Sequence, residues 1–252
     1  MKLLVSVVDE HEALEAIKGG ADILDVKNPR EGSLGANFPW IIERVKRVAI
    51  DVEVSATLGD LPNLPGTAAL AAFGAACSDV DYVKAGLYGS RNFSEATELM
   101  VAVCKAAKGY RPKVKVVASG YGDYKEIGCI SPLDLPAIAY KAECDGILVD
   151  LKLKDGRRLF DFLDTNELNR LAAEAHDNGL TVALAGSLSV DDIAKVWGIG
   201  ADIIGVRGAV CTGRDRVKGV VDRRLVAMWA QKMKELNVSN CKPAVSEGVR
   251  DF

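Results

Sequence analysis

Short, almost continuous runs of apolar residues alternate with longer amphipathic segments along the whole chain. Eight of the apolar runs have the length and the β-branched content of strands, and the segments between them are long enough for a helix. Several runs, such as GILVD and ADIIGV, are apolar at nearly every position, which is typical of parallel strands covered on both faces. The predicted strands are Leu3 to Val7, Ile23 to Val26, Val52 to Thr57, Tyr82 to Ala85, Val114 to Ser119, Gly146 to Val149, Thr181 to Ala185 and Ile203 to Val206.

This alternation predicts an α/β protein that folds as a single (β/α)₈ barrel of the TIM type. Eight strand and helix units of even length favour closure, and a chain of 252 residues matches the roughly 250 residues of one such barrel. A doubly wound open sheet is the structural alternative. No change of composition divides the chain, so we expect the barrel over residues 1–236 and a loosely packed C-terminal tail over residues 237–252.

Charge and composition narrow the range of partners. The formal net charge is -3, which is not the basic balance of a nucleic-acid-binding domain. Charged residues interrupt every apolar run before the ~18 residues that a membrane span needs. The six cysteines show no C-x-x-C pair and no secretory signal precedes the first apolar run, so we expect reduced thiols in a cytoplasmic protein. A small soluble molecule is the expected partner, and the oligomeric state, a homo-oligomer included, stays open.

Candidate chemistry lies at the strand ends, because the working side chains of a barrel come from the C-terminal ends of its strands. Asp25 and Lys27 occupy alternate positions at the end of the second strand and therefore share a face. Lys84 ends the fourth strand within an apolar stretch, and Asp150 ends the sixth strand shortly before Lys154. Each of these residues, taken singly, has a structural alternative as a solvated loop charge or an ion pair. Their convergence on one rim favours an active site.

Clustered lysines have a specific use. Repulsion between ammonium groups and loss of hydration lower the pKa of an amine, which then attacks a carbonyl carbon to form an imine. The only two histidines of the sequence, His11 and His176, fall in predicted helices away from the rim, which disfavours a histidine triad and a histidine-rich metal site. The chain contains neither a P-loop nor a dinucleotide fingerprint. We therefore expect Schiff-base chemistry without a metal or an organic cofactor.

The ends of the last two strands predict a phosphate site. The motifs are Ala185-Gly186-Ser187 and the segment GVRGA, which contains Arg207 and Gly208. Barrels commonly bind phosphate after strands seven and eight. The glycines Gly186 and Gly208 let the backbone approach an anion, Ser187 donates from its hydroxyl, and Arg207 offers a planar fork. The structural alternative is that the glycines only turn the chain.

Five segments of the sequence together resemble one known family over nearly the whole chain. They are DVKNPREGSLGANFPW, VSATLGD, DYVKAGLYG, DLKLKDGRRLFDFL and ALAGSL. The family is that of (5-formylfuran-3-yl)methyl phosphate synthase, also called 4-(hydroxymethyl)-2-furancarboxaldehyde-phosphate synthase, of methanofuran biosynthesis. The DVKNP motif with its GSLGANFPW loop is highly specific, whereas GVRGA alone fits many phosphate-binding barrels.

This resemblance implies a lysine-dependent, aldolase-like lyase. Such an enzyme condenses two molecules of glyceraldehyde 3-phosphate into (5-formylfuran-3-yl)methyl phosphate, with loss of one phosphate and two waters. The resemblance further implies that Lys27 is the Schiff-base lysine and that Lys84 accepts a proton. It marks Asp25, Asp150 and Lys154 as the other charges of the active site. Lys152 lies near them in the sequence and receives no role.

Two other functions stay compatible with the residues themselves. Another Schiff-base aldolase for triose or pentose phosphates would share the imine-forming lysine and the phosphate site. A non-catalytic phosphosugar-binding protein would use the same lysines only to neutralise anions. The two differ from the synthase in what they make from glyceraldehyde 3-phosphate alone.

Overall fold

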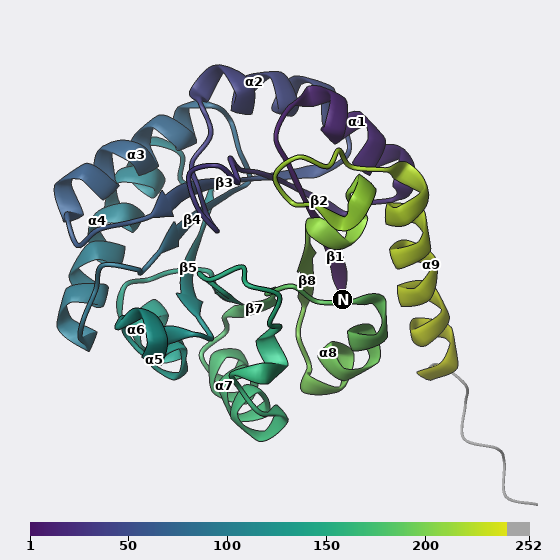
Figure 1. The fold of residues 1–252 in the computed structure, drawn as a ribbon. Helices are drawn as coiled ribbons and strands as arrows, with labels where there is room; N and C mark the ends of the chain where they lie inside the picture. The colour runs from purple at the N-terminus through teal and green to yellow at the C-terminus, as the bar shows by residue number, and fades with distance from the viewer. Residues whose placement is uncertain (241–252) are drawn as a thin grey trace, which may run out of the picture.

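Eight parallel strands form a closed barrel that the helices surround (Figure 1). The computed structural model of the protein describes residues 1–240. The strands are β1 (Lys2–Val7), β2 (Ile23–Val26), β3 (Glu53–Asp60), β4 (Tyr82–Gly86), β5 (Lys115–Tyr121), β6 (Gly146–Asp150), β7 (Thr181–Leu184) and β8 (Ile203–Val206). The helices are α1 (Glu10–Gly19), α2 (Pro39–Val48), α3 (Pro65–Cys77), α4 (Phe93–Tyr110), α5 (Tyr124–Ile127), α6 (Leu135–Lys141), α7 (Thr165–Asp177), α8 (Ile193–Ile199) and α9 (Arg223–Asn240).

The pairing of β1 with β8 closes the sheet. Leu3 is the register partner of Ile204 there, while the other edge of β1 pairs with β2. The predicted closed barrel is therefore confirmed, and the open doubly wound sheet is excluded. Four strands run further toward their C-terminal ends than the sequence predicts: β3 to Asp60, β4 to Gly86, β5 to Tyr121 and β6 to Asp150. Helix α9 continues past residue 236, and residues 241–252 of the predicted tail lie outside the described residues.

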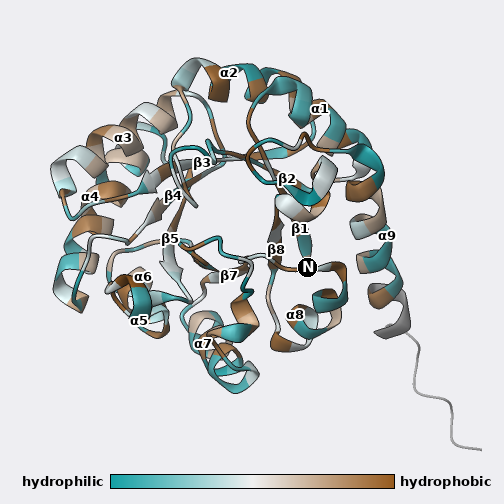
Figure 2. Cartoon of the chain, viewed as in Figure 1, coloured by the Kyte–Doolittle hydropathy of each residue, from teal (hydrophilic) through white to brown (hydrophobic). Residues whose placement is uncertain are grey.

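Alternate strand positions supply two separate apolar cores, which explains the nearly continuous apolar runs of the sequence. One set of side chains fills the barrel, and the larger set packs between the strands and the helices. The surrounding helices carry both hydrophilic and hydrophobic residues along their length (Figure 2). The barrel interior contains Leu4, Ile23, Leu34, Tyr82, Val117, Tyr121, Leu148, Ala183, Ala185 and Ile203.

Polar side chains close the N-terminal end of the barrel. The Tyr82 hydroxyl donates to Glu53 Oε1 at 3.0 Å and accepts from Lys115 Nζ at 3.1 Å. Lys2 forms an ion pair with the same glutamate. Burial, opposed by the hydrogen bond from Lys115, raises the pKa of Tyr82, so its phenol stays a donor. This network lies at the opposite end of the strands from the predicted catalytic residues.

Candidate active site

A cavity of about 880 Å³ lies at the carboxyl ends of the strands. It falls within the range of about 300–1,000 Å³ that is usual for small-molecule sites. All nine site residues predicted from the sequence line it: Asp25, Lys27, Lys84, Asp150, Lys154, Gly186, Ser187, Arg207 and Gly208. Closure of the barrel thus brings residues from five strand ends around one space.

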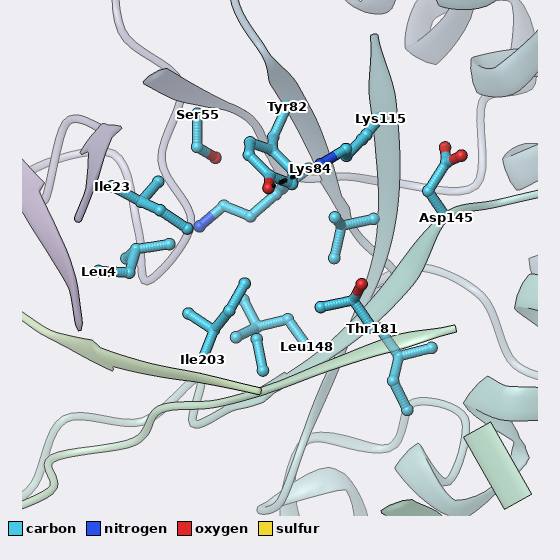
Figure 3. Close-up of a pocket in the computed structure, with 13 residues that line it drawn as sticks. Leu4, Ile23, Ser55, Tyr82, Lys84, Lys115, Asp145, Leu148, Thr181 and Ile203 are labelled. Atoms are coloured by element: carbon cyan, nitrogen blue, oxygen red, sulfur yellow. Dashed lines mark hydrogen bonds between the residues drawn. The ribbon is translucent and has the colours of Figure 1, made fainter. Parts of the chain in front are cut away.

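Lys84 and Asp25 form a buried ion pair across the barrel interior. Lys84 Nζ lies 2.7 Å from Asp25 Oδ1, and the two side chains are only 5% and 1% exposed. The Ser6 hydroxyl donates to the other oxygen of Asp25 at 3.0 Å. Figure 3 shows the Lys84 side chain reaching from β4 toward Ile23 and Leu4, along a small apolar pocket. Asp25 stabilises the buried ammonium group of Lys84, because a charge without a counter-ion in such apolar surroundings would raise the free energy of the folded state.

Lys27, one residue beyond β2, presents a different kind of amine to the cavity. Among the described residues, its Nζ forms neither a hydrogen bond nor an ion pair, although its side chain is buried. Burial lowers the pKa of Lys27 to about 8, and the ammonium groups of Lys84 and Lys154 add to the effect against the opposing charges of Asp150 and Asp25. Roughly a tenth of such an amine is neutral at pH 7. A neutral and unencumbered amine is the form that attacks a carbonyl carbon.

Asp150 and Lys154 make the second ion pair of the cavity. Lys154 Nζ donates to Asp150 Oδ1 at 2.7 Å, and the backbone N–H of Leu151 donates to the same oxygen at 2.7 Å. Burial opposes the charged form of Asp150, but the positive charges of Lys154 and Lys27 outweigh it and hold the pKa of this carboxyl well below its usual range. Asp150 is therefore a carboxylate at neutral pH. Lys152 points elsewhere, over the ring of Tyr88 with Nζ 4.9 Å from its centroid.

The loops after β7 and β8 present backbone N–H groups to the cavity. Gly186 has φ 112°, and Ser187 has φ 54°, a left-handed conformation that is uncommon for a residue other than glycine. A Cβ atom on Gly186 would lie 3.1 Å from Leu151 and 3.2 Å from Leu159. Among the described residues, no acceptor receives the N–H of Ser187, Gly208 or Ala209. Free N–H groups beside a cavity suit an anion such as phosphate.

The geometry does not favour the predicted contact between Arg207 and phosphate. The Arg207 guanidinium is buried, donates to Glu12 Oε2 at 2.8 Å and to the Ser6 carbonyl at 2.9 Å, and is only 4% exposed. Its Nε donates to the carbonyl of Arg216 at 2.7 Å. Glu12 lies on α1, and nothing in the sequence indicated that Arg207 would form an ion pair with a residue of that helix. Arg207 thus ties the β8 loop to β1 and α1.

Arg216, which the sequence analysis did not select, supplies an unpaired cation in its place. Its guanidinium lines the cavity, donates to the carbonyls of Pro29 at 3.4 Å and Gly32 at 3.0 Å, and has no carboxylate within 4.0 Å among the described residues. Burial lowers its pKa while Asp150 opposes that effect. The position of Arg216 after β8 could have indicated a role at the phosphate site, but Arg207 in GVRGA lies closer to the end of that strand and was chosen instead.

The described residues contain no group of three or more His, Cys, Asp or Glu side chains arranged to hold a metal ion. His11 lies in α1 and His176 in α7, as predicted, and His176 Nε2 lies 2.9 Å from Asp202. Within residues 1–240, no helix is long and apolar enough to cross a membrane. The charged side chains that line the cavity are lysines, arginines and aspartates.

Comparison with solved structures supports the barrel fold. Solved structures that resemble the chain include 3-hexulose-6-phosphate synthase, with a TM-score of 0.60 at 21% identity over 93% of this chain and 99% of that one. Another is KGPDC from Streptococcus mutans, with a TM-score of 0.63 at 14% identity over 93% and 97% of the two chains. At such identities these likenesses support the barrel fold alone.

Sequence relatives are much closer. The (5-formylfuran-3-yl)methyl phosphate synthase of Methanocaldococcus jannaschii is 52% identical over 94% of this chain and 99% of its own. The protein of the same name from Archaeoglobus fulgidus is 52% identical over 90% and 96% of the two chains. The family model for 4-HFC-P synthase matches residues 3–230. The chain therefore belongs to the 4-HFC-P synthase family.

Proposed function

We propose that the protein condenses two molecules of glyceraldehyde 3-phosphate into (5-formylfuran-3-yl)methyl phosphate through an imine on Lys27. The observation that carries the proposal is the amine of Lys27, which is buried, has a pKa lowered to about 8 by that burial, and lines the cavity without a hydrogen-bond or ion-pair partner in residues 1–240. Close relatives of the protein are named (5-formylfuran-3-yl)methyl phosphate synthase. A lysine with these properties is the nucleophile that carbonyl chemistry requires.

The Lys84–Asp25 pair is suited to move the first proton. In the proposed reaction, Lys84 first gives one proton to the carboxylate of Asp25 at 2.7 Å, and the neutral amine then removes a proton from the carbon beside the aldehyde of one triose phosphate. Return of that proton to the former aldehyde carbon of the resulting enediolate gives the ketone. Lys27 captures the ketone as an imine, whose enamine form attacks the aldehyde of the second triose. Elimination of phosphate, ring closure and dehydration follow, with Asp150 and Lys154 exchanging protons with the leaving groups. Two triose phosphates equal the product plus one phosphate and two waters.

For the phosphate of the bound substrate, we propose the backbone N–H groups of Gly186, Ser187 and Gly208, together with the guanidinium of Arg216. A Cβ atom on Gly208 would lie 3.7 Å from Arg216 Cβ, so this side chain starts beside the free N–H groups. Charge-assisted bonds from a guanidinium to phosphate are stronger than neutral hydrogen bonds. Arg207 acts in this scheme by positioning the β8 loop through its bond to the Arg216 carbonyl.

Product analysis with glyceraldehyde 3-phosphate as the sole substrate tests the proposal. The expected result is an ultraviolet-absorbing furan aldehyde with release of one phosphate for every two trioses consumed. Formation of a hexose bisphosphate without a furan would instead support a Schiff-base aldolase. Binding of the substrate without any turnover would support a phosphosugar-binding protein.

Imine formation is expected to depend on pH through Lys27. Because only the neutral amine reacts, the rate of imine formation should rise with pH and level off above about 8, the pKa of the buried amine. The folded chain binds fewer protons at Lys27 than the unfolded chain between this pKa and the ordinary value of 10.5, so Lys27 makes the free energy of unfolding rise with pH in that window. The rate is measured as the initial rate of borohydride-dependent inactivation in the presence of glyceraldehyde 3-phosphate. A rate independent of pH across the neutral range would contradict the assignment.

Arg216→Ala is expected to weaken substrate binding. Loss of a charge-assisted contact of about 1.5–3 kcal/mol corresponds to a rise in KM of about tenfold to a hundredfold. Arg207→Ala is the matched comparison, because it removes a guanidinium whose partner is the buried Glu12. Breaking that pair should cost about 3–5 kcal/mol of stability and lower the Tm. Steady-state kinetics and thermal unfolding of both variants separate the two roles; an unchanged KM in Arg216→Ala would remove this residue from the phosphate site.

A further inference from the structure

We call residues 28–38, which lie in the loop between β2 and α2 after Lys27, the strap. The Ser33 hydroxyl donates to the Leu151 carbonyl just beyond β6 at 2.6 Å. From β3, Thr57 Oγ1 donates to a strap carbonyl at 2.8 Å, and Arg216 holds two further strap carbonyls from the β8 side. The strap is thus tied to three separate parts of the barrel rim.

Asp60, the last residue of β3, is the charged anchor of the strap. Its Oδ2 accepts the N–H of Ser33 at 2.9 Å, and its Oδ1 accepts the N–H of Leu34 at 3.3 Å and the hydroxyl of Tyr121 at 2.5 Å. Burial, with the negative charge of Asp60, raises the pKa of Tyr121 well above its usual value, so the phenol stays a donor. A Cβ atom on Gly32 would lie 2.1 Å from Asp60 Oδ2, so the strap approaches this carboxylate as closely as only glycine allows.

The anchored strap forms one wall of the catalytic cavity. Leu34 is 1% exposed, joins the apolar cluster inside the barrel and lines the cavity beside Lys27 and Lys84. The hydroxyl of the neighbouring Ser33 also lies 3.3 Å from Asp150 Oδ2. Asp60 itself is not among the residues that line the cavity. Besides the strap and Tyr121, it contacts Lys152, whose Nζ lies 3.5 Å from Asp60 Oδ2.

The proposed reaction contains an intermediate that such a wall would protect. An enediolate of a triose phosphate can expel its own phosphate: the electron pair of the enediolate forms a new carbon–carbon double bond, the carbon–oxygen bond to phosphate breaks, and the enol takes up a proton to become methylglyoxal. One triose phosphate equals methylglyoxal plus phosphate, and no oxidant or reductant is needed. Enclosure that excludes water and fixes the intermediate suppresses side reactions of this kind.

We propose that Asp60 is a positioning residue that holds the strap over the cavity and thereby determines whether the enediolate is protonated to the ketone that Lys27 captures or lost as methylglyoxal. This inference rests on the proposed function, since that function supplies the enediolate. The amide of asparagine would present donor hydrogens to backbone N–H groups that now meet a carboxylate oxygen, so Asp60→Asn loosens the strap with little change of side-chain size.

The experiment measures both products from glyceraldehyde 3-phosphate, the furan aldehyde by its absorbance and methylglyoxal as its quinoxaline derivative, with an enzyme-free blank. Asp60→Asn is expected to raise the ratio of methylglyoxal to furan by at least about tenfold, with a lower kcat for the furan and a nearly unchanged KM. Tyr121→Phe removes one hydrogen bond to the same carboxylate without changing charge, and it should shift the ratio in the same direction by less. This second variant keeps the inference testable where Asp60→Asn does not fold.

Asp81→Asn is the matched control. Asp81 accepts the N–H of Val54 at 2.8 Å and pairs with Lys46 at 2.7 Å, near the N-terminal ends of β3 and β4 and away from the strap. Its ratio should equal that of the unaltered protein. An unchanged ratio in both Asp60→Asn and Tyr121→Phe would overturn the role of Asp60, whereas absence of furan from the unaltered protein would overturn the proposed function instead.

Discussion

Lys27→Arg is expected to abolish furan formation, with turnover falling on the order of 10⁴-fold or more because the nucleophile itself is lost. Arginine keeps a positive charge in the cavity beside Asp150 and Asp25, but its guanidinium forms no imine under these conditions. The charge balance of the site is therefore preserved while covalent chemistry is removed. Steady-state turnover of glyceraldehyde 3-phosphate is the first measurement.

Covalent trapping is the second measurement for this residue. Borohydride added during turnover should leave a triose phosphate on the peptide that contains Lys27, identified by mass spectrometry, and no adduct on the Lys27→Arg variant. Lys115→Arg, at the opposite end of the barrel, is the control and should trap the substrate normally. Turnover by Lys27→Arg, or an adduct found only on Lys84 or Lys154, would contradict the assignment.

Lys84→Gln is expected to stop proton transfer, with a loss in kcat of about 10²- to 10⁴-fold. Exchange of solvent deuterium into the carbon beside the substrate carbonyl should stop with it. The variant also leaves the carboxylate of Asp25 buried without its counter-ion, 1% exposed, which should cost about 3–5 kcal/mol of stability. Deuterium exchange and the free energy of unfolding are therefore both measured.

The double variant Asp25→Asn with Lys84→Gln separates catalysis from folding. Removing both charges takes away the unpaired carboxylate, so most of the lost stability should return, while deuterium exchange stays absent. Recovery of exchange in the double variant would show that stability, and not the amine, limits Lys84→Gln. Normal exchange in Lys84→Gln itself would point to another base in the cavity.

The site residues at the C-terminal strand ends could be predicted directly from the sequence. In a closed parallel barrel, the residues at C-terminal strand ends gather on one rim, so Asp25, Lys27, Lys84 and Asp150 followed from their positions alone. Alternation along β2 also placed Asp25 and Lys27 on one face, and both line the cavity. These inferences need only the periodicity of strands and the direction of the chain.

Asp60 was not predicted as a strand-end residue, because the predicted third strand ended at Thr57 and β3 continues to Asp60. The segment Leu58-Gly59-Asp60 reads as a turn, and Gly59 has φ 119° with a break in the β3–β4 register nearby. Pairing of Asp60 with Gly86 on β4 nevertheless carries the strand on to the carboxylate. Pairing with a neighbouring strand is a long-range interaction, so the local pattern of apolar residues does not predict it.

By itself, the sequence determined the closed barrel and placed the lysines at the C-terminal rim, where they line the cavity, because these features follow from hydrophobic period and chain order. Tertiary structure alone decided how the charges are shared. Lys84 pairs with Asp25, Lys154 with Asp150, and Arg207 with Glu12 of α1, whereas Lys27 and Arg216 have no carboxylate within 4.0 Å in the part of the chain that the structure describes. Which cation is left free depends on distances of a few ångströms between segments far apart in the chain, and only the packed barrel sets those distances.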